Sequence, residues 1–221
     1  MLLSKGQRLL FIGDSITDCG RARPMAEGND ALLGTGYVSL IQAFLRSTYP
    51  ELEIHTINQG IGGNTVRDLK NRWQEDVIAH RPDWLAISIG INDVWRQFDS
   101  PTMPEKHVYE EEYEQTLRQL IVDTKSKVQG TIVLSPFYLE VNKEDPMRAK
   151  MDTYSAIAHR VATEQKVLFV DVQAAFDQVL QHLYSTILAA DRVHPHTTGH
   201  IIIARAFLQA IGYDWNKGIS L

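Results

Sequence analysis

The chain has 221 residues, of which 44% are hydrophobic and 22% charged, a composition that is typical of a folded globular protein and excludes a disordered or collagen-like chain. Its length predicts one domain spanning residues 1–221, because no linker, repeat or change of composition divides it. The 22 Lys and Arg residues against 27 Asp and Glu residues give a net charge of −5, which argues against nucleic acid or anionic lipid as a partner.

Short apolar runs rich in β-branched residues predict five strands, at 9–12, 54–57, 84–89, 131–134 and 167–170. Helical periodicity is clearest over 66–77 and 151–161. Residues 105–127 are predicted to form an amphipathic helix with an acidic face toward solvent, and residues 19–36 and 96–105 to form loops. Strands that alternate with helices predict a parallel sheet covered on both faces, which is a three-layer α/β/α sandwich.

A serine, a histidine and an aspartate lie in turn-like sequences at opposite ends of the chain. Ser15 follows the first predicted strand, where parallel sheets commonly hold their ligands, and Asp191 lies three residues before His194. A serine nucleophile needs a neutral imidazole, and the imidazole needs a carboxylate to fix its tautomer. The three residues supply these parts, although each of them also suits a helix cap or a turn.

Two further motifs follow the second and third predicted strands. The first is the glycine-rich turn Gly60-Ile61-Gly62-Gly63, and the second is Gly90-Ile91-Asn92-Asp93. Acyl transfer needs hydrogen-bond donors at the oxyanion that develops on the substrate. The backbone N–H groups of Ser15 and Gly63, with the side-chain amide of Asn92, are candidates for these donors.

Taken in order, the blocks around Ser15, Gly63, Asn92 and Asp191 with His194 resemble those of the SGNH (GDSL-type) hydrolases. The resemblance spans most of the chain. It implies a flavodoxin-like sheet of five parallel strands in the order 2-1-3-4-5, and a Ser-His-Asp esterase with the oxyanion donors just named. It also implies catalysis without a metal or an organic cofactor.

Other stretches resemble the bacterial intracellular acetylxylan esterases of this superfamily, which remove acetyl groups from xylo-oligosaccharides. They are 17–24, 34–37, 92–97 and 145–148. This resemblance implies an acetylated sugar as the substrate. Asp14, Trp95, Arg96 and Tyr138 are candidate substrate contacts, and for the aromatic residues the alternative is a place in the core.

Alternatives remain open at this stage. Members of the superfamily also act as lipases, thioesterases and arylesterases, so the substrate is less defined than the reaction. A metal-dependent hydrolase is a second possibility, because Asp191, His194, His196 and His200 are close in sequence, although a helix starting near 197 is expected to direct His196 and His200 apart. A noncatalytic carbohydrate-binding module is a third.

The single cysteine, Cys19, excludes an internal disulfide and suits a reducing compartment. Nothing near it in sequence supplies a base, so it is expected to be a partly buried packing residue. The N-terminal apolar run is too short for a signal peptide, and no stretch approaches the ~20 apolar residues that span a bilayer. We therefore expect a cytoplasmic protein, with a homo-oligomer as a further expectation from the resemblance.

Overall fold

A computed structural model describes residues 1–217 of the chain. Its strands form one parallel sheet in the order β2-β1-β3-β4-β5, which confirms the predicted topology. The strands are β1 (Arg8–Gly13), β2 (His55–Gly60), β3 (Trp84–Ser88), β4 (Gly130–Leu134) and β5 (Leu168–Val170). The helices are α1 (Ser15–Asp18), α2 (Tyr37–Thr48), α3 (Val66–Asp76), α4 (Ile91–Asp99), α5 (Glu110–Lys125), α6 (Pro146–Gln165), α7 (Val172–Leu180), α8 (Ser185–Leu188) and α9 (Thr197–Ala210).

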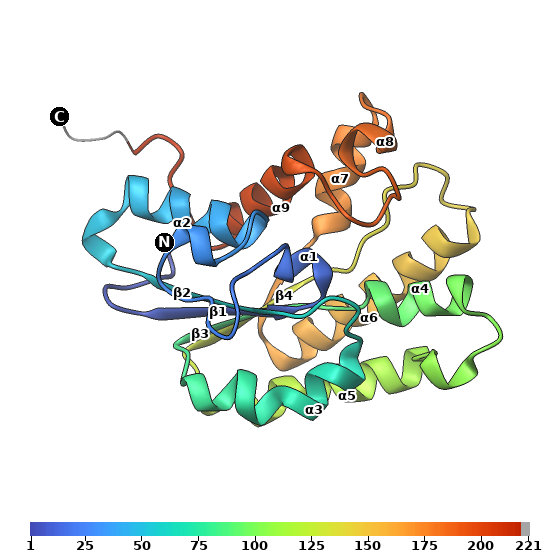
Figure 1. Cartoon of the computed structure of the whole chain (residues 1–221), viewed down its shortest axis with the longest axis horizontal. Coiled ribbons are helices and arrows are strands. Elements are labelled where there is room, and N and C mark those ends of the chain that lie inside the picture. The colour runs from blue at the N-terminus through green and yellow to red at the C-terminus, as the bar shows by residue number, and fades with distance from the viewer. Residues whose placement is uncertain (218–221) are drawn as a thin grey trace.

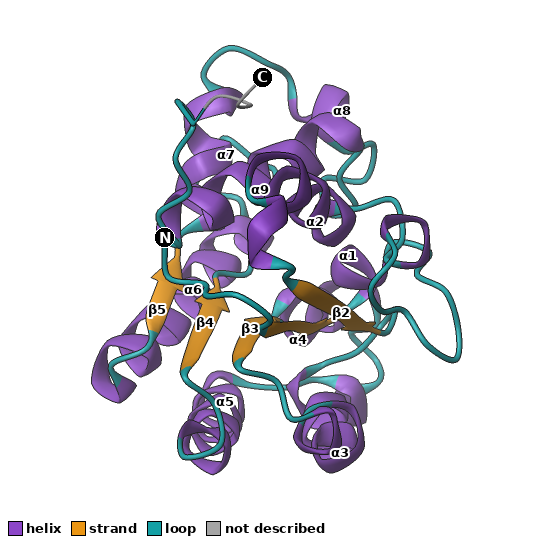
Figure 2. Cartoon of the chain, turned by 90° about the vertical axis from the view of Figure 1, so that its left-hand side faces the viewer, coloured by secondary structure: helices purple, strands orange, loops and turns teal. Residues whose placement is uncertain are grey.

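The helices form a layer on each face of the sheet, so the predicted three-layer sandwich is confirmed. Figure 1 shows α2, α7 and α9 on one face and α3, α5 and α6 on the other. Figure 2 shows the strands between α2 and α9 on one side and α3 and α5 on the opposite side. Within residues 1–217, no helix has the length and apolar character needed to cross a bilayer.

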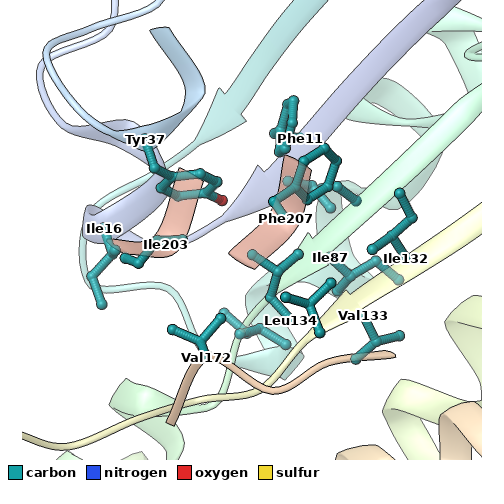
Figure 3. Packing of buried hydrophobic residues seen from close by; sticks show 14 of the residues in the cluster. Phe11, Ile16, Tyr37, Ile87, Ile132, Val133, Leu134, Val172, Ile203 and Phe207 are labelled. Atoms are coloured by element: carbon teal, nitrogen blue, oxygen red, sulfur yellow. The ribbon is translucent and has the colours of Figure 1, made fainter. Parts of the chain in front are cut away.

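The central strands are buried on both faces because helices cover both sides of the sheet. Leu10 of β1 pairs with Ile57 of β2 and with Leu85 of β3, and all three side chains are buried. Phe11 packs against Tyr37 of α2 and Phe207 of α9, with ring centroids 5.7 and 5.1 Å apart. Figure 3 shows these aromatic rings in the apolar layer between the sheet and the helices.

Several helices begin at side chains that accept backbone N–H groups, as the local sequence favours. The Asp145 carboxylate accepts from the N–H groups of Met147 and Arg148 at the start of α6, where Pro146 has no N–H to satisfy. Asp171 accepts from Ala174 N–H at the start of α7. These caps fix the residue at which each helix begins.

Several predicted boundaries need correction, and three of the differences are larger than a single residue. The second strand extends three residues past 57 to Gly60, because Asn58 and Gln59 are buried polar residues in the ladder. Part of the loop expected at 96–105 is helical, since α4 continues to Asp99 and Pro104–Lys106 form a 3-10 turn. The acidic helix begins at Glu110 and not at 105.

Candidate active site

Ser15 begins α1 directly after β1, at the carboxyl end of the sheet. The Asp14 carboxylate caps this turn by accepting the Ile16 N–H over 2.9 Å. The end of β2 approaches the same turn so closely that a Cβ on Gly60 would lie 2.1 Å from Asp18 N. Only glycine fits at position 60. Because it has no side chain, the turn that follows β2 can lie beside Ser15.

Asp191 and His194 lie in the loop before α9, and they reach Ser15 from the far end of the chain. Asp191 Oδ1 accepts the backbone N–H groups of Val193 and His194 over 2.9 and 2.8 Å, which folds the turn tightly. Asp191 Oδ2 lies 2.6 Å from His194 Nδ1, and His194 Nε2 lies 2.8 Å from Ser15 Oγ. The predicted Ser-His-Asp triad is therefore confirmed.

The triad geometry fixes the direction of proton transfer. Since the carboxylate can only accept, Nδ1 carries the hydrogen and Nε2 is free to accept the proton of the serine hydroxyl. Partial burial raises the pKa of Asp191, but hydrogen bonds from the His194 side chain and from the two backbone N–H groups outweigh this and lower it overall. Asp191 consequently stays ionised and stabilises the imidazolium that forms during the reaction.

The glycine-rich turn and the start of α4 meet next to Ser15. A Cβ on Gly62 would lie 3.8 Å from Ser15 Cβ, and Gly63 has a φ of 80°, a conformation that favours glycine. Asn92 Nδ2 donates to Asn64 O over 3.0 Å, and the Asn92 side chain is 2% exposed. The three predicted oxyanion donors thus come from adjoining segments around the nucleophile.

Two side chains that hold these segments together, the buried Asp93 and the half-buried Arg72, were not singled out from the sequence. Asp93 accepts the N–H of Val66 over 3.0 Å and so joins α4 to the start of α3. Arg72 of α3 donates to Gly13 O, Gln59 O and Asn64 Oδ1 over 3.0, 2.8 and 2.7 Å. Asp93 belongs to the motif Gly90-Ile91-Asn92-Asp93, so the sequence could have pointed to it. No local pattern distinguishes Arg72 from a solvated arginine on a helix.

The four candidate substrate contacts have different surroundings. The Trp95 ring lies 5.7 Å from the His194 ring, and the loop that carries Tyr138 is joined to the triad turn by a bond from Leu139 N to Arg192 O. The Arg96 guanidinium is hydrogen bonded to Asn92. Asp14 is 2% exposed, and its contact with the substrate remains a prediction.

His200 and Cys19 form a contact that the local sequence did not reveal. His200 Nδ1 accepts the N–H of Tyr37 over 3.2 Å, and Nε2 lies 3.4 Å from Cys19 Sγ, a separation of 181 positions in the chain. Burial lowers the pKa of His200 to about 4. Cys19 is partly buried, as expected, and the imidazole beside it comes from a segment far away in the sequence. Within residues 1–217, no three His, Cys, Asp or Glu side chains are grouped so as to hold a metal.

Comparison with known proteins agrees with the geometry of the triad. The model of the GDSL-like Lipase/Acylhydrolase family matches residues 11–202. The chain belongs to this family. It is 59% identical over 215 residues to an acetylxylan esterase of Geobacillus stearothermophilus, with 97% of this chain and 98% of the relative covered.

Solved structures of relatives in the family share the whole fold. The crystal structure of Axe2, an acetylxylan esterase from Geobacillus stearothermophilus, has a TM-score of 0.96 at 59% identity over 97% of this chain and 98% of that one. LAE5, an alpha/beta hydrolase enzyme from the metagenome of Lake Arreo, has a TM-score of 0.95 at 50% identity, covering 96% and 98%. Catalytic mutants of Axe2 are S15A, D191A and H194A, and this chain has the same residues at these numbers.

Proposed function

We propose that this serine esterase removes acetyl groups from xylo-oligosaccharides. The observation that carries the proposal is the Ser15–His194–Asp191 chain of hydrogen bonds in a protein 59% identical to an acetylxylan esterase. A cytoplasmic location and assembly into a homo-oligomer remain predictions.

In the proposed reaction, Ser15 Oγ attacks the acetyl carbonyl carbon while His194 Nε2 accepts the hydroxyl proton. The carbonyl oxygen becomes an oxyanion that accepts hydrogen bonds from Ser15 N–H, Gly63 N–H and the Asn92 amide. The bond to the sugar oxygen then breaks, and His194 returns its proton to that oxygen. Water hydrolyses the acetyl-enzyme by the same steps, with His194 again acting as the base.

The surroundings of the triad support a sugar alcohol as the leaving group. Trp95, half-buried beside the His194 ring, offers an aromatic face on which a pyranose ring can stack. Tyr138 is half-buried in the loop next to the triad turn and offers a hydroxyl group. Both remain proposed substrate contacts.

The test is a substrate panel in which the released acid is measured. It contains acetylated xylo-oligosaccharides, N-acetylated sugars, and aryl esters with acyl chains from acetyl to octanoyl. We expect the highest kcat/KM with acetylated xylo-oligosaccharides and falling values as the acyl chain lengthens, because a small acyl site rejects longer chains by steric clash. A kcat/KM that rises steadily toward octanoyl would replace the proposal with a lipolytic function.

Ser15→Ala is the control for the panel, since it removes the attacking oxygen from a half-buried turn with little loss of packing. The variant should lose at least ~10³-fold in kcat while its melting temperature stays near that of the wild type. If folded Ser15→Ala kept a tenth of the activity, the serine mechanism itself would be wrong.

A further inference from the structure

Arg96 lies one helical turn beyond Asn92 on the same face of α4. Its Nη2 atom donates to Asn92 Oδ1 over 3.0 Å, as the spacing of four residues allows. Nη1 pairs with Asp99, and the guanidinium carbon lies 5.0 Å from the centre of the Trp95 ring. Contacts on three sides thus fix the guanidinium against the Asn92 side chain.

The two neighbours of the Asn92 amide have opposite hydrogen-bonding character. A guanidinium can only donate, so it must face the amide oxygen, whereas the carbonyl oxygen of Asn64 can only accept, so it must face Nδ2. Turning the amide over would place donor against donor and acceptor against acceptor. Arg96 and Asn64 together select one orientation of the amide.

This orientation leaves one Asn92 N–H for the substrate. Nδ2 carries two hydrogens, and within residues 1–217 it makes a single hydrogen bond, to Asn64 O. The Asn92 side chain is 2% exposed, so solvent has little access to it. The bond from the charged guanidinium to Oδ1 also draws electron density from the amide, which makes the remaining N–H a stronger donor.

We propose that Arg96 is a positioning residue for ester hydrolysis, which orients and polarises the Asn92 amide for the oxyanion. The proposal rests on the oxyanion role proposed for Asn92, and it replaces the expected contact between Arg96 and the sugar. Acylation and deacylation both pass through an oxyanion, so kcat depends on this amide whichever step is slower. Removing Arg96 should therefore lower kcat, whereas removing a sugar contact should raise KM.

The first experiment measures kcat and KM of Arg96→Met with 4-nitrophenyl acetate, which contains no sugar, and with an acetylated xylo-oligosaccharide. We expect kcat to fall about 10-fold on both substrates with KM little changed, a smaller loss than the ~10²-fold expected for Asn92→Ala. The matched control is Asp99→Ala, which breaks the same ion pair but keeps the bond from Arg96 to Asn92. Its kcat should stay within about twofold of the wild type.

The second experiment combines the two substitutions. In Asn92→Ala there is no amide to orient, so adding Arg96→Met should cause no further loss of kcat. An equal fold-loss in both backgrounds would overturn the proposal, as would a rise in KM on the oligosaccharide with kcat unchanged.

Arg96→Lys is a second variant in case Arg96→Met does not fold, because lysine keeps the charge and most of the aliphatic stem. Its kcat should lie between those of the wild type and Arg96→Met, and a wild-type kcat in every folded Arg96 variant would contradict the inference. If the wild-type protein hydrolysed none of the esters, the proposed function would fail instead. The two failures are therefore distinguishable.

Discussion

Two buried carboxyl groups, those of Asp14 and Asp93, lie in surroundings that disfavour their charge. Asp14 is 2% exposed and Asp93 fully buried, and burial raises the pKa of each to about 7, although hydrogen bonds from Ile16 N–H and Val66 N–H oppose the shift. Asp93 Oδ2 has no hydrogen-bond partner within residues 1–217. The nearby Asp14 carboxyl group adds to the rise in the pKa of Asp93, since two negative charges close together repel each other.

Replacing Asp93 with Asn should reduce the pH dependence of stability. The pKa of Asp93 is raised from 3.8 to about 7 on folding, so between these values the folded state binds more protons than the unfolded state. The free energy of unfolding must then fall as pH rises through this window, by at most about 1.4 kcal/mol per pH unit for one proton. Urea unfolding of the wild type and Asp93→Asn, from about pH 5 to about pH 8, measures the two slopes.

Asp123→Asn, an exposed substitution on α5, is the control for this comparison and should leave the slope unchanged. Asp14→Asn should act in the same direction as Asp93→Asn, because its pKa is raised by the same cause. Equal slopes in the wild type and Asp93→Asn would show that Asp93 does not titrate differently in the folded state.

At the scale of single residues, the sequence predicted the groups that react but not the side chains that hold those groups in place. Ser15, His194 and Asp191 are recognisable because the chemistry demands these residue types and each of them lies in a turn-like sequence. Arg96 was expected at the sugar, since local sequence does not show that its partner is the Asn92 amide. Contacts between distant segments, such as Cys19 with His200, depend on packing that no local pattern encodes.

At the scale of elements, Arg72 joins α3 to the carboxyl ends of two strands. It donates to the backbone carbonyl of Gly13 at the end of β1 and to the backbone carbonyl of Gln59 in β2. It also donates to the side chain of Asn64, beside the glycine-rich turn. A guanidinium has five donors in a rigid fork, so one side chain can hold three segments at fixed separations. The position of the proposed Gly63 donor relative to Ser15 depends on this clamp.

Arg72→Met should destabilise the protein by about 3 kcal/mol, because it leaves buried acceptors without the charged donor they share. It should also lower kcat, since the turn that carries Gly63 loses a support. Thermal unfolding and aryl acetate hydrolysis measure the two effects. The matched control is Arg118→Met on α5, where the arginine pairs with Glu114 and Glu164 at the surface, and about 1 kcal/mol or less is expected. Equal losses in the two variants would remove the special role of Arg72.

The order of strands and helices was predictable because apolar periodicity differs between the two kinds of element. The boundaries of the elements were less predictable, and buried polar residues explain why. Asn58 reads as a turn residue, yet its amide donates to Thr17 O and Leu33 O inside the protein, so the strand can continue past it. Likewise, residues 96–99, three of which are polar, resemble a loop, although they complete the last turn of α4.

At the scale of the whole molecule, one apolar cluster joins the sheet to the helices that cover it. In that cluster α9 packs over the middle of the sheet, and Figure 3 shows its Phe207 beside Phe11 of β1. The same helix begins just after the turn that carries Asp191 and His194. The packing of α9 therefore holds Asp191 and His194 close to Ser15, which lies in the turn after β1.

Phe207→Ala should separate global stability from catalysis. The side chain is fully buried, so its removal leaves a cavity and should cost about 3–5 kcal/mol. Residue 207 lies ten positions beyond Thr197, about 15 Å along the helix, so the triad turn should keep its geometry. We therefore expect a lower melting temperature in calorimetry but a near wild-type kcat at a temperature where the variant is folded.

The control is Gln209→Ala, an exposed change on the same helix turn, which should alter the free energy of unfolding by no more than about 0.5 kcal/mol. A large fall in kcat in folded Phe207→Ala would mean that the whole length of α9, and not its first turn alone, sets the position of His194.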